Sequence, residues 1–293
     1  LLRNNRKQTG VAGMWSLLNW TRRALRENMP DDQIDRDLIT AEGSTLQNGP
    51  ANFYRIARTP TDLAEATAQV VLGVRIQCAR CHHHPFEKWG QDDFYGLAGF
   101  FNGMKRESLD ENRELIYHPG HKSMAIPVIN QAVDTRPLAG SATSADGQTD
   151  PRPELASWVT ARDNPTFSKL VSNRIWKHLM GRGLVEPEDD FRETNPPTNP
   201  ELLDHLADTL VDINFDIKSL MRHILNSKSF QLSSTPNESN YTDDQMFSHY
   251  LVRRMPAEVM LDAICHVTLA PEQYAGHPQG TRAIDLWLSL IHI

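Results

Sequence analysis

The chain has 293 residues, of which 39% are hydrophobic and 23% charged, proportions typical of a folded globular protein. This length is enough for two ordinary domains. No apolar run approaches the roughly 20 residues that a membrane-spanning helix needs, so we expect no membrane span in this region. The formal net charge of −7 argues against nucleic-acid binding, which requires a basic face.

The two ends of the sequence carry little information. Leu1 is neither an initiator methionine nor the start of a signal-peptide pattern, so we expect the chain to be truncated there. Residues 289–293 break the preceding pattern and look like a translated sequencing adapter. We therefore expect a truncated C-terminal end and exclude these residues from the interpretation.

Helix signals dominate the first half of the chain. Thr59 and Pro60, followed by Asp62, combine an N-cap, a proline at the first helical position and an acid placed to complete the cap. Apolar residues at helical spacing follow this start and also occur in two other stretches. The predicted helices cover residues 13–28, residues 60 to the cysteines at 78, and residues 92–104.

The second half begins after a segment with the composition of a linker. Residues 124–129 predict a short strand, and residues 139–152 are rich in Gly, Ser, Thr, Asp and Pro, which is typical of a linker or long loop. Four helix starts follow, at Asn164-Pro165, Asn199-Pro200, Asp216 and Pro256. The predicted fold is mostly α, with two helical domains or subdomains, long irregular connections and little β structure. The first domain covers residues 1–138 and the second residues 153–293.

The chemistry of the chain centres on Cys78-Ala79-Arg80-Cys81-His82, the spacing typical of covalent haem attachment. Two thiols three positions apart can add to the vinyl groups on one edge of a porphyrin, and His82 can then bind the iron as its proximal ligand. The third cysteine, Cys265, is isolated among apolar residues and is predicted to be a buried core residue, so no disulfide framework is expected. The alternative interpretation is a reduced thiol pair that only packs.

Other metal ligands and charged groups leave further interpretations open. The candidates for the sixth iron ligand or another metal role are His84, His118, His121, Met104 and Met124. Arg75 and Arg80 could neutralise haem propionates, or be solvated. Cys78 and Cys81 with His118 and His121 would instead form a Cys2His2 set suited to tetrahedral zinc, although the gap is long and His82 then has no role.

The second half also has a dense polar cluster, formed by Asn173, Arg174, His178, Arg182, Asp189, Asp190 and Arg192. One interpretation pairs His178 with Asp189 or Asp190 as acid and base of a hydrolase-like enzyme. The favoured interpretation is a structural Arg–Asp network that ties a loop to a helix.

Two long motifs carry a resemblance to known families. Residues 73–89 and 93–97 closely resemble the planctomycete cytochrome-c-like domain, and residues 41–43 and 48–54 fit the same family. Residues 173–176, 178–185, 189–191 and 195–197 resemble the planctomycete-specific domain of unknown function that commonly follows it. The resemblance implies a secreted or periplasmic protein of planctomycetes or related bacteria, with haem bound at the Cys-x-x-Cys-His motif.

Three functional hypotheses follow. The first is an extracytoplasmic c-type haem protein with a redox or electron-transfer role, in which Cys78 and Cys81 form the thioethers and His82 binds the iron. The second is a structural zinc site on a scaffold or interaction protein. The third is the hydrolase-like enzyme. The sequence identifies no substrate, redox or protein partner, or oligomeric state.

Overall fold

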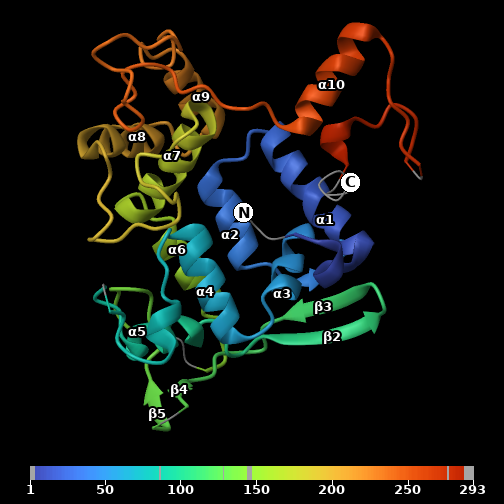
Figure 1. Cartoon of the computed structure of the whole chain (residues 1–293). Helices are drawn as coiled ribbons and strands as arrows, with labels where there is room; N and C mark the ends of the chain where they lie inside the picture. Colours follow the sequence, from blue (N-terminus) through green and yellow to red (C-terminus); the bar gives the residue numbers. More distant parts are fainter. Residues whose placement is uncertain (1–3, 86, 128, 144–146, 276, 287–293) are drawn as a thin grey trace. The chain divides into compact units, whose positions relative to one another are not determined.

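The computed structural model describes residues 4–85, 87–127, 129–143, 147–275 and 277–286 (Figure 1). The chain forms two compact units, Leu1–Tyr250 and Leu251–Ile293. The expected adapter residues 289–293 and the first three residues lie outside the described part. No helix formed by the described residues is long and apolar enough to cross a membrane.

The first unit opens with α1 (Arg6–Arg26), which bends at Gly10 and includes most of the helix predicted over residues 13–28. The side chain of Asn5 caps its start by accepting a hydrogen bond from the Gln8 amide. The next helix, α2 (Asp31–Ile39), was not predicted. It starts after Pro30, which has no side-chain hydrogen-bonding group, so the usual N-cap signal is missing. A 3-10 turn, η1 (Gly49–Asn52), and α3 (Phe53–Ile56) complete this region.

The helix predicted from residue 60 to the cysteines is shorter than expected. α4 (Pro60–Val71) begins with the predicted capping box between Thr59 and Asp62. It then ends at Val71, and Gly73 adopts a φ of 67°, in the left-handed region. Cys78 lies instead on a separate 3-10 turn, η2 (Gln77–Arg80), and Cys81 directly follows this turn as its C-cap. The single continuous helix was therefore a wrong prediction.

α5 (Gln91–Gly99) is shorter than the helix predicted over residues 92–104, and small antiparallel sheets form from strands on both sides of it in the sequence. β1 (Gly43–Ser44), β3 (Arg113–Tyr117) and β2 (Lys105–Asp110) pair in the order β1-β3-β2. β2 was not predicted because its residues are almost all polar and exposed, so no alternation marks it. β4 (Met124–Ile126) pairs with β5 (Gln131–Val133), which confirms the start of the short strand predicted over residues 124–129. Residue 128 of that prediction lies outside the described part.

The helices that follow residue 164 start where the capping residues predicted, whereas α6 (Arg152–Val159), which precedes them, was not predicted. After α6, the side chains of Asn164, Asn199 and Asp216 cap α7 (Pro165–Met180), α8 (Pro200–Asp212) and α9 (Ile217–Leu225). α7 ends at Gly181, which has a φ of 87°. α7 packs against both α8 and α9. The buried apolar residues between them include Phe167, Leu170, Leu206, Leu210, Leu220 and Ile224.

The first unit includes residues on both sides of the predicted linker at 139–152. α6 packs against α2, and the Arg152 side chain is fully buried among residues of the first half. The division into domains at 139–152 stays a prediction about the organisation of the sequence, and residues 144–146 of that segment lie outside the described part. The mostly α fold with little β structure is confirmed.

The second unit contains α10 (Ala257–Thr268) and a 3-10 turn, η3 (Ala283–Asp285). α10 follows Pro256, as predicted, and the Asp262 carboxylate accepts hydrogen bonds from the Ala283 and Ile284 amides. No residue of α10 is buried. Cys265 is only partly buried, so its prediction as a core residue was wrong.

Candidate functional site

The cysteine motif lies on η2, and α5 holds this turn from its inner side. Ile76 and Ala79 are fully buried. The Tyr95 hydroxyl and Gln91 Nε2 both donate hydrogen bonds to the carbonyl of Arg80, each over 3.3 Å. Buried anchors therefore fix the backbone of the turn while the intervening side chains point away from the core.

Cys78, Cys81 and His82, the predicted haem-binding residues, are all exposed, and neither cysteine forms a disulfide. His82 Nδ1 lies 2.6 Å from the backbone oxygen of His83. Because a carbonyl oxygen can only accept a hydrogen bond, this contact places the proton on Nδ1. His82 Nε2 then keeps its lone pair, which is the form of imidazole that binds a metal.

After the exposed motif, the chain packs against the core of the protein again at the buried Trp89. The His84 amide donates to the Trp89 carbonyl over 2.9 Å, and Lys88 Nζ lies 4.9 Å from the centre of the Trp89 ring. The His83 ring packs on Gly90, where a Cβ atom would lie only 2.7 Å from His83 Cε1. The segment between Val74 and Lys88 is called the cysteine loop below. It is thus fixed at both ends, and its His82 and His83 side chains are exposed.

The two arginines considered for haem propionates already have carboxylate partners. Arg75 pairs with Asp189 over 2.5 Å, and Arg80 lies 3.6 Å from Glu65. Burial opposes ionisation of Asp189, but hydrogen bonds from Arg75 and Gln69 outweigh it and lower the pKa of this carboxyl. Arg75 therefore ties the start of the cysteine loop to the loop after α7.

His118 lies at a buried position, away from the exposed cysteine motif. Its side chain has no exposed surface, and Nδ1 lies 3.7 Å from Asp150 Oδ1. Its amide donates to Glu42 Oε1 over 3.1 Å. Burial lowers the pKa of His118, which favours the neutral ring.

The other predicted ligands are dispersed. His121 Nε2 lies 2.7 Å from Thr135 Oγ1, and Met104 follows α5 in a half-buried turn. Within the part of the chain that the structure describes, no group of three or more His, Cys, Asp or Glu side chains is placed to hold a metal ion. The structure therefore does not bring Cys78 and Cys81 together with His118 and His121, the set considered for zinc.

The polar cluster of the second half is connected by hydrogen bonds and ion pairs. The buried Asn173 accepts hydrogen bonds from the Leu184 and Val185 amides and donates to the Val185 carbonyl. Arg192 pairs with Asp190 over 2.7 Å. His178, the acid–base candidate, is exposed on α7. These contacts agree with the favoured interpretation, a network that ties the loop to the helix.

Two groups of charged residues were missed by the sequence reasoning. Arg152, inside the predicted linker, contacts Asp150, Glu42 and the Tyr54 hydroxyl. Asp31 on α2 has a pKa raised to about 6, because burial outweighs the nearby Arg174. Neither group has a local signal, since each depends on residues far apart in the sequence.

Comparison with known protein families gives two matches in succession. Residues 3–106 match PSCyt2, a protein of unknown function (DUF1549), and residues 151–284 match PSD1, a protein of unknown function (DUF1553). The predicted resemblance is thereby confirmed: the chain carries a PSCyt2 segment followed by a PSD1 segment. No curated protein and no solved structure matches the chain.

Proposed function

We propose that this chain is a c-type haem protein with an electron-transfer role. The observation that carries the proposal is the exposed Cys78, Cys81 and His82 on a turn whose backbone is held by buried neighbours. The name of the PSCyt2 family, which points to a cytochrome-like role, supports it.

The donor set fits the requirements of haem attachment. Cys78 and Cys81 have accessible thiols that can form thioethers to the two vinyl groups. His82 Nε2 is the nitrogen left to bind iron, because Nδ1 is held by the His83 carbonyl. When bound, the haem would supply an iron that changes oxidation state by one electron.

Residues other than His82 could also hold a bound haem iron. His84, His121 and Met104 remain candidates for this role. His118 is disfavoured, because binding iron would require its fully buried ring to leave the pocket beside Asp150. His84, His121 and Met104 are only partly buried.

Covalent haem attachment takes place outside the cytoplasmic membrane, so the proposal includes a periplasmic or other extracytoplasmic location. A redox partner in the same compartment would exchange electrons with the haem. Because Cys78, Cys81 and His82 are exposed, a haem bound there would be accessible to such a partner.

The test is expression in the periplasm of a bacterium that has the c-type haem maturation machinery. We expect a haemochrome spectrum and a haem stain that survives denaturation. Cys78→Ala and Cys81→Ala should change the haemochrome spectrum by leaving one vinyl group free, and the double variant should lose the covalent stain.

Cys265→Ala is the matched control, since it removes the third cysteine, in the other unit, and should leave the stain unchanged. A colourless wild-type protein with stoichiometric zinc that is lost in Cys78→Ala would contradict the proposal and favour the zinc-site scaffold. A colourless protein without metal would contradict both.

A further inference from the structure

The loop of residues 186–193, which follows α7, contacts the cysteine loop near both of its ends. At the start, Asp189 Oδ1 accepts a hydrogen bond from Arg75 Nη2 over 2.5 Å. Near the end, the Glu193 amide donates to Glu87 Oε1 over 3.2 Å. The 186–193 loop lies in the PSD1 segment and the cysteine loop in the PSCyt2 segment, so one segment supports the site that the other carries.

Asp189 uses its two carboxylate oxygens for partners on different parts of the PSCyt2 segment. Oδ1 binds Arg75, and Oδ2 accepts a hydrogen bond from Gln69 Nε2 on α4. Gln69 precedes the turn at Gly73, and Arg75 follows it. A single carboxylate therefore connects the end of α4 to the start of the cysteine loop, across the turn between them.

Other residues of the PSD1 segment hold the same turn. The Phe191 amide donates to the Gly73 carbonyl over 2.9 Å. The Arg174 guanidinium on α7 donates to the carbonyls of Gln69 and Val70, in the last turn of α4. The direction in which the chain leaves α4 is thus determined by contacts with residues about a hundred positions further along.

The 186–193 loop is itself bound to α7, which gives Asp189 a fixed position. Lys177 Nζ on α7 lies 2.5 Å from Glu186 Oε1 and 2.5 Å from Glu188 Oε2. The Gly183 amide donates to Glu186 Oε2 over 3.0 Å. Because these contacts hold the residues before Asp189, its carboxylate can hold Arg75 rather than follow it.

The position of Arg75 in turn affects the cysteine motif. Arg75 stands three residues before Cys78, and Ile76 between them is fully buried. So short a segment, anchored at both points, leaves η2 little freedom to move relative to Arg75.

We propose that Asp189 is a positioning residue for the cysteine motif, and that the candidate site is therefore built jointly by the PSCyt2 and PSD1 segments. Asp189 acts through Arg75 and Gln69 and holds the cysteine loop in the orientation seen here. The effect on a bound haem rests on the proposed function, whereas the effect on the loop requires no haem.

The experiment is hydrogen–deuterium exchange of the haem-free full chain, followed by mass spectrometry of its peptides. Asp189→Asn keeps the size of the side chain but replaces one oxygen by an NH2 group, which cannot accept from Arg75 or Gln69. We expect the amides of residues 76–88 to exchange about tenfold faster, as the loss of a charge-assisted hydrogen bond predicts. Exchange in α8 should stay unchanged, which would show that the variant is folded.

Glu188→Gln is the matched control, because it removes the same charge from the neighbouring residue, whose partner is Lys177. Its cysteine loop should exchange like that of the wild type. Arg75→Gln removes the pair from the other side and should also accelerate exchange of the loop. In the double variant Arg75→Gln/Asp189→Asn, the two effects should be less than additive, since both changes remove one pair.

Three results of the exchange experiment would overturn the proposal. The first is unchanged exchange of the cysteine loop in Asp189→Asn and Arg75→Gln. The second is equal acceleration by Asp189→Asn and Glu188→Gln. The third is an equal acceleration of α8, which would show that Asp189 stabilises the fold as a whole and not this loop.

The reduction potential of the haem-loaded protein tests the consequence for the proposed site. Asp189→Asn and Glu188→Gln each remove one negative charge, which disfavours the oxidised iron and raises the potential. Asp189→Asn should raise or otherwise shift it more, because it also releases the loop that carries His82. Equal shifts would overturn the role of Asp189 in positioning the site. A chain that attaches no haem would contradict the proposed function, and the exchange experiment would still decide the role of Asp189.

Discussion

At the scale of single residues, burial determines which charged groups are structural. Arg152 has no exposed side-chain surface, yet its guanidinium is well satisfied. It donates to Asp150 Oδ2 over 2.8 Å, to Glu42 Oε1 over 2.7 Å and to the Ala41 carbonyl over 3.0 Å, and it lies over the Tyr54 ring. The buried Arg152 holds its surroundings in one arrangement, because removing it would take a partner from the Ala41 carbonyl and from the Asp150 and Glu42 carboxylates.

We therefore expect Arg152→Met to destabilise the fold by about 3–5 kcal/mol, the usual cost of removing one partner of a buried ion pair. Urea denaturation monitored by circular dichroism measures the change. Arg113→Met is the control, since Arg113 forms an exposed pair with Asp110 and should cost less than about 1 kcal/mol. Similar losses for the two variants would show that the Arg152 network adds nothing to stability.

At the scale of secondary structure, local signals determined what could be predicted. The caps at Thr59, Asn164, Asn199 and Asp216 are local, and each marks a helix start in the structure. The end of α4 has a different cause. The Phe191 amide donates to the Gly73 carbonyl over 2.9 Å, so the turn depends on a residue far along the chain. A tertiary contact of this kind produces no periodic pattern in the sequence, so the end of α4 could not be predicted from it.

Substituting Gly73 tests this explanation of the turn before the cysteine loop. A Cβ at Gly73 would lie 2.8 Å from Leu170 Cδ1 and 2.9 Å from Phe191 Cδ2, in addition to its left-handed φ. We expect Gly73→Ala to cost about 2–4 kcal/mol, combining roughly 1 kcal/mol of backbone strain with the displacement of core side chains.

Gly43→Ala is the matched control, since Gly43 also has a positive φ but an added Cβ would meet no atom within 4 Å. It should show only the backbone part of the cost, about 1 kcal/mol. Thermal and urea unfolding of the two variants give the comparison. If both variants lose the same stability, packing of Leu170 and Phe191 does not fix this turn.

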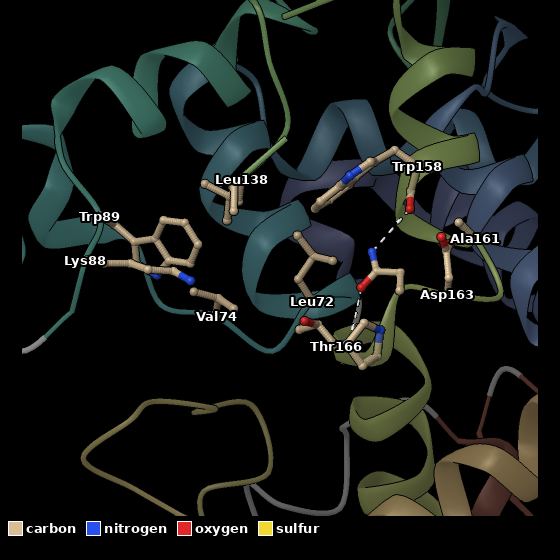
Figure 2. A pocket seen from close by; sticks show the side chains of 12 residues that line it. Leu72, Val74, Lys88, Trp89, Leu138, Trp158, Ala161, Asp163 and Thr166 are labelled. Atoms are coloured by element: carbon tan, nitrogen blue, oxygen red, sulfur yellow. Dashed lines mark hydrogen bonds between the residues drawn. The ribbon is translucent and has the colours of Figure 1, made fainter. Parts of the chain in front are cut away.

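The candidate site was also predicted only in part, because sequence reveals local motifs and not contacts between distant residues. The motif from Cys78 to His82 is contiguous, so sequence alone could identify its residues as a candidate site. Sequence could not show that Arg75 pairs with Asp189, or that His118 is buried beside Asp150, because these partners lie more than thirty positions away. The pocket lined by Trp89, Leu138 and Trp158 was not predicted, because its lining comes from four separate stretches of chain (Figure 2).

At the scale of the whole molecule, residues of the two family segments form one compact unit up to Tyr250. Asp31 on α2 lies near Arg174 on α7, so the pKa of Asp31 depends on the packing between these segments. Burial raises its pKa from 3.8 to about 6. A carboxyl that binds its proton more tightly when folded contributes stability below pH 3.8, and this contribution is lost as the pH rises through about 6.

We expect Asp31→Asn to remove the part of this pH dependence that belongs to Asp31, while Asp35 on the same helix, whose pKa burial also raises, keeps its own part. Relative to the wild type, the variant should gain roughly 1–2 kcal/mol at pH 7.5 and nothing at pH 4, after allowance for the lost charge at the helix start. Urea denaturation at the two pH values measures the difference. Asp92→Asn, at the exposed first turn of α5, should show no gain at pH 7.5. An equal effect of Asp31→Asn at both pH values would contradict the assignment.

The most direct test of haem attachment is mass spectrometry of a tryptic digest of the periplasmic protein. Trypsin cleaves after Arg75, Arg80 and Lys88, so Cys78 and Cys81 fall on different peptides, residues 76–80 and 81–88. If both thiols are joined to one porphyrin, the two peptides must appear as a single species that carries the mass of haem. Separate, unmodified peptides from a preparation in which the host's own c-type cytochromes are fully matured would contradict it.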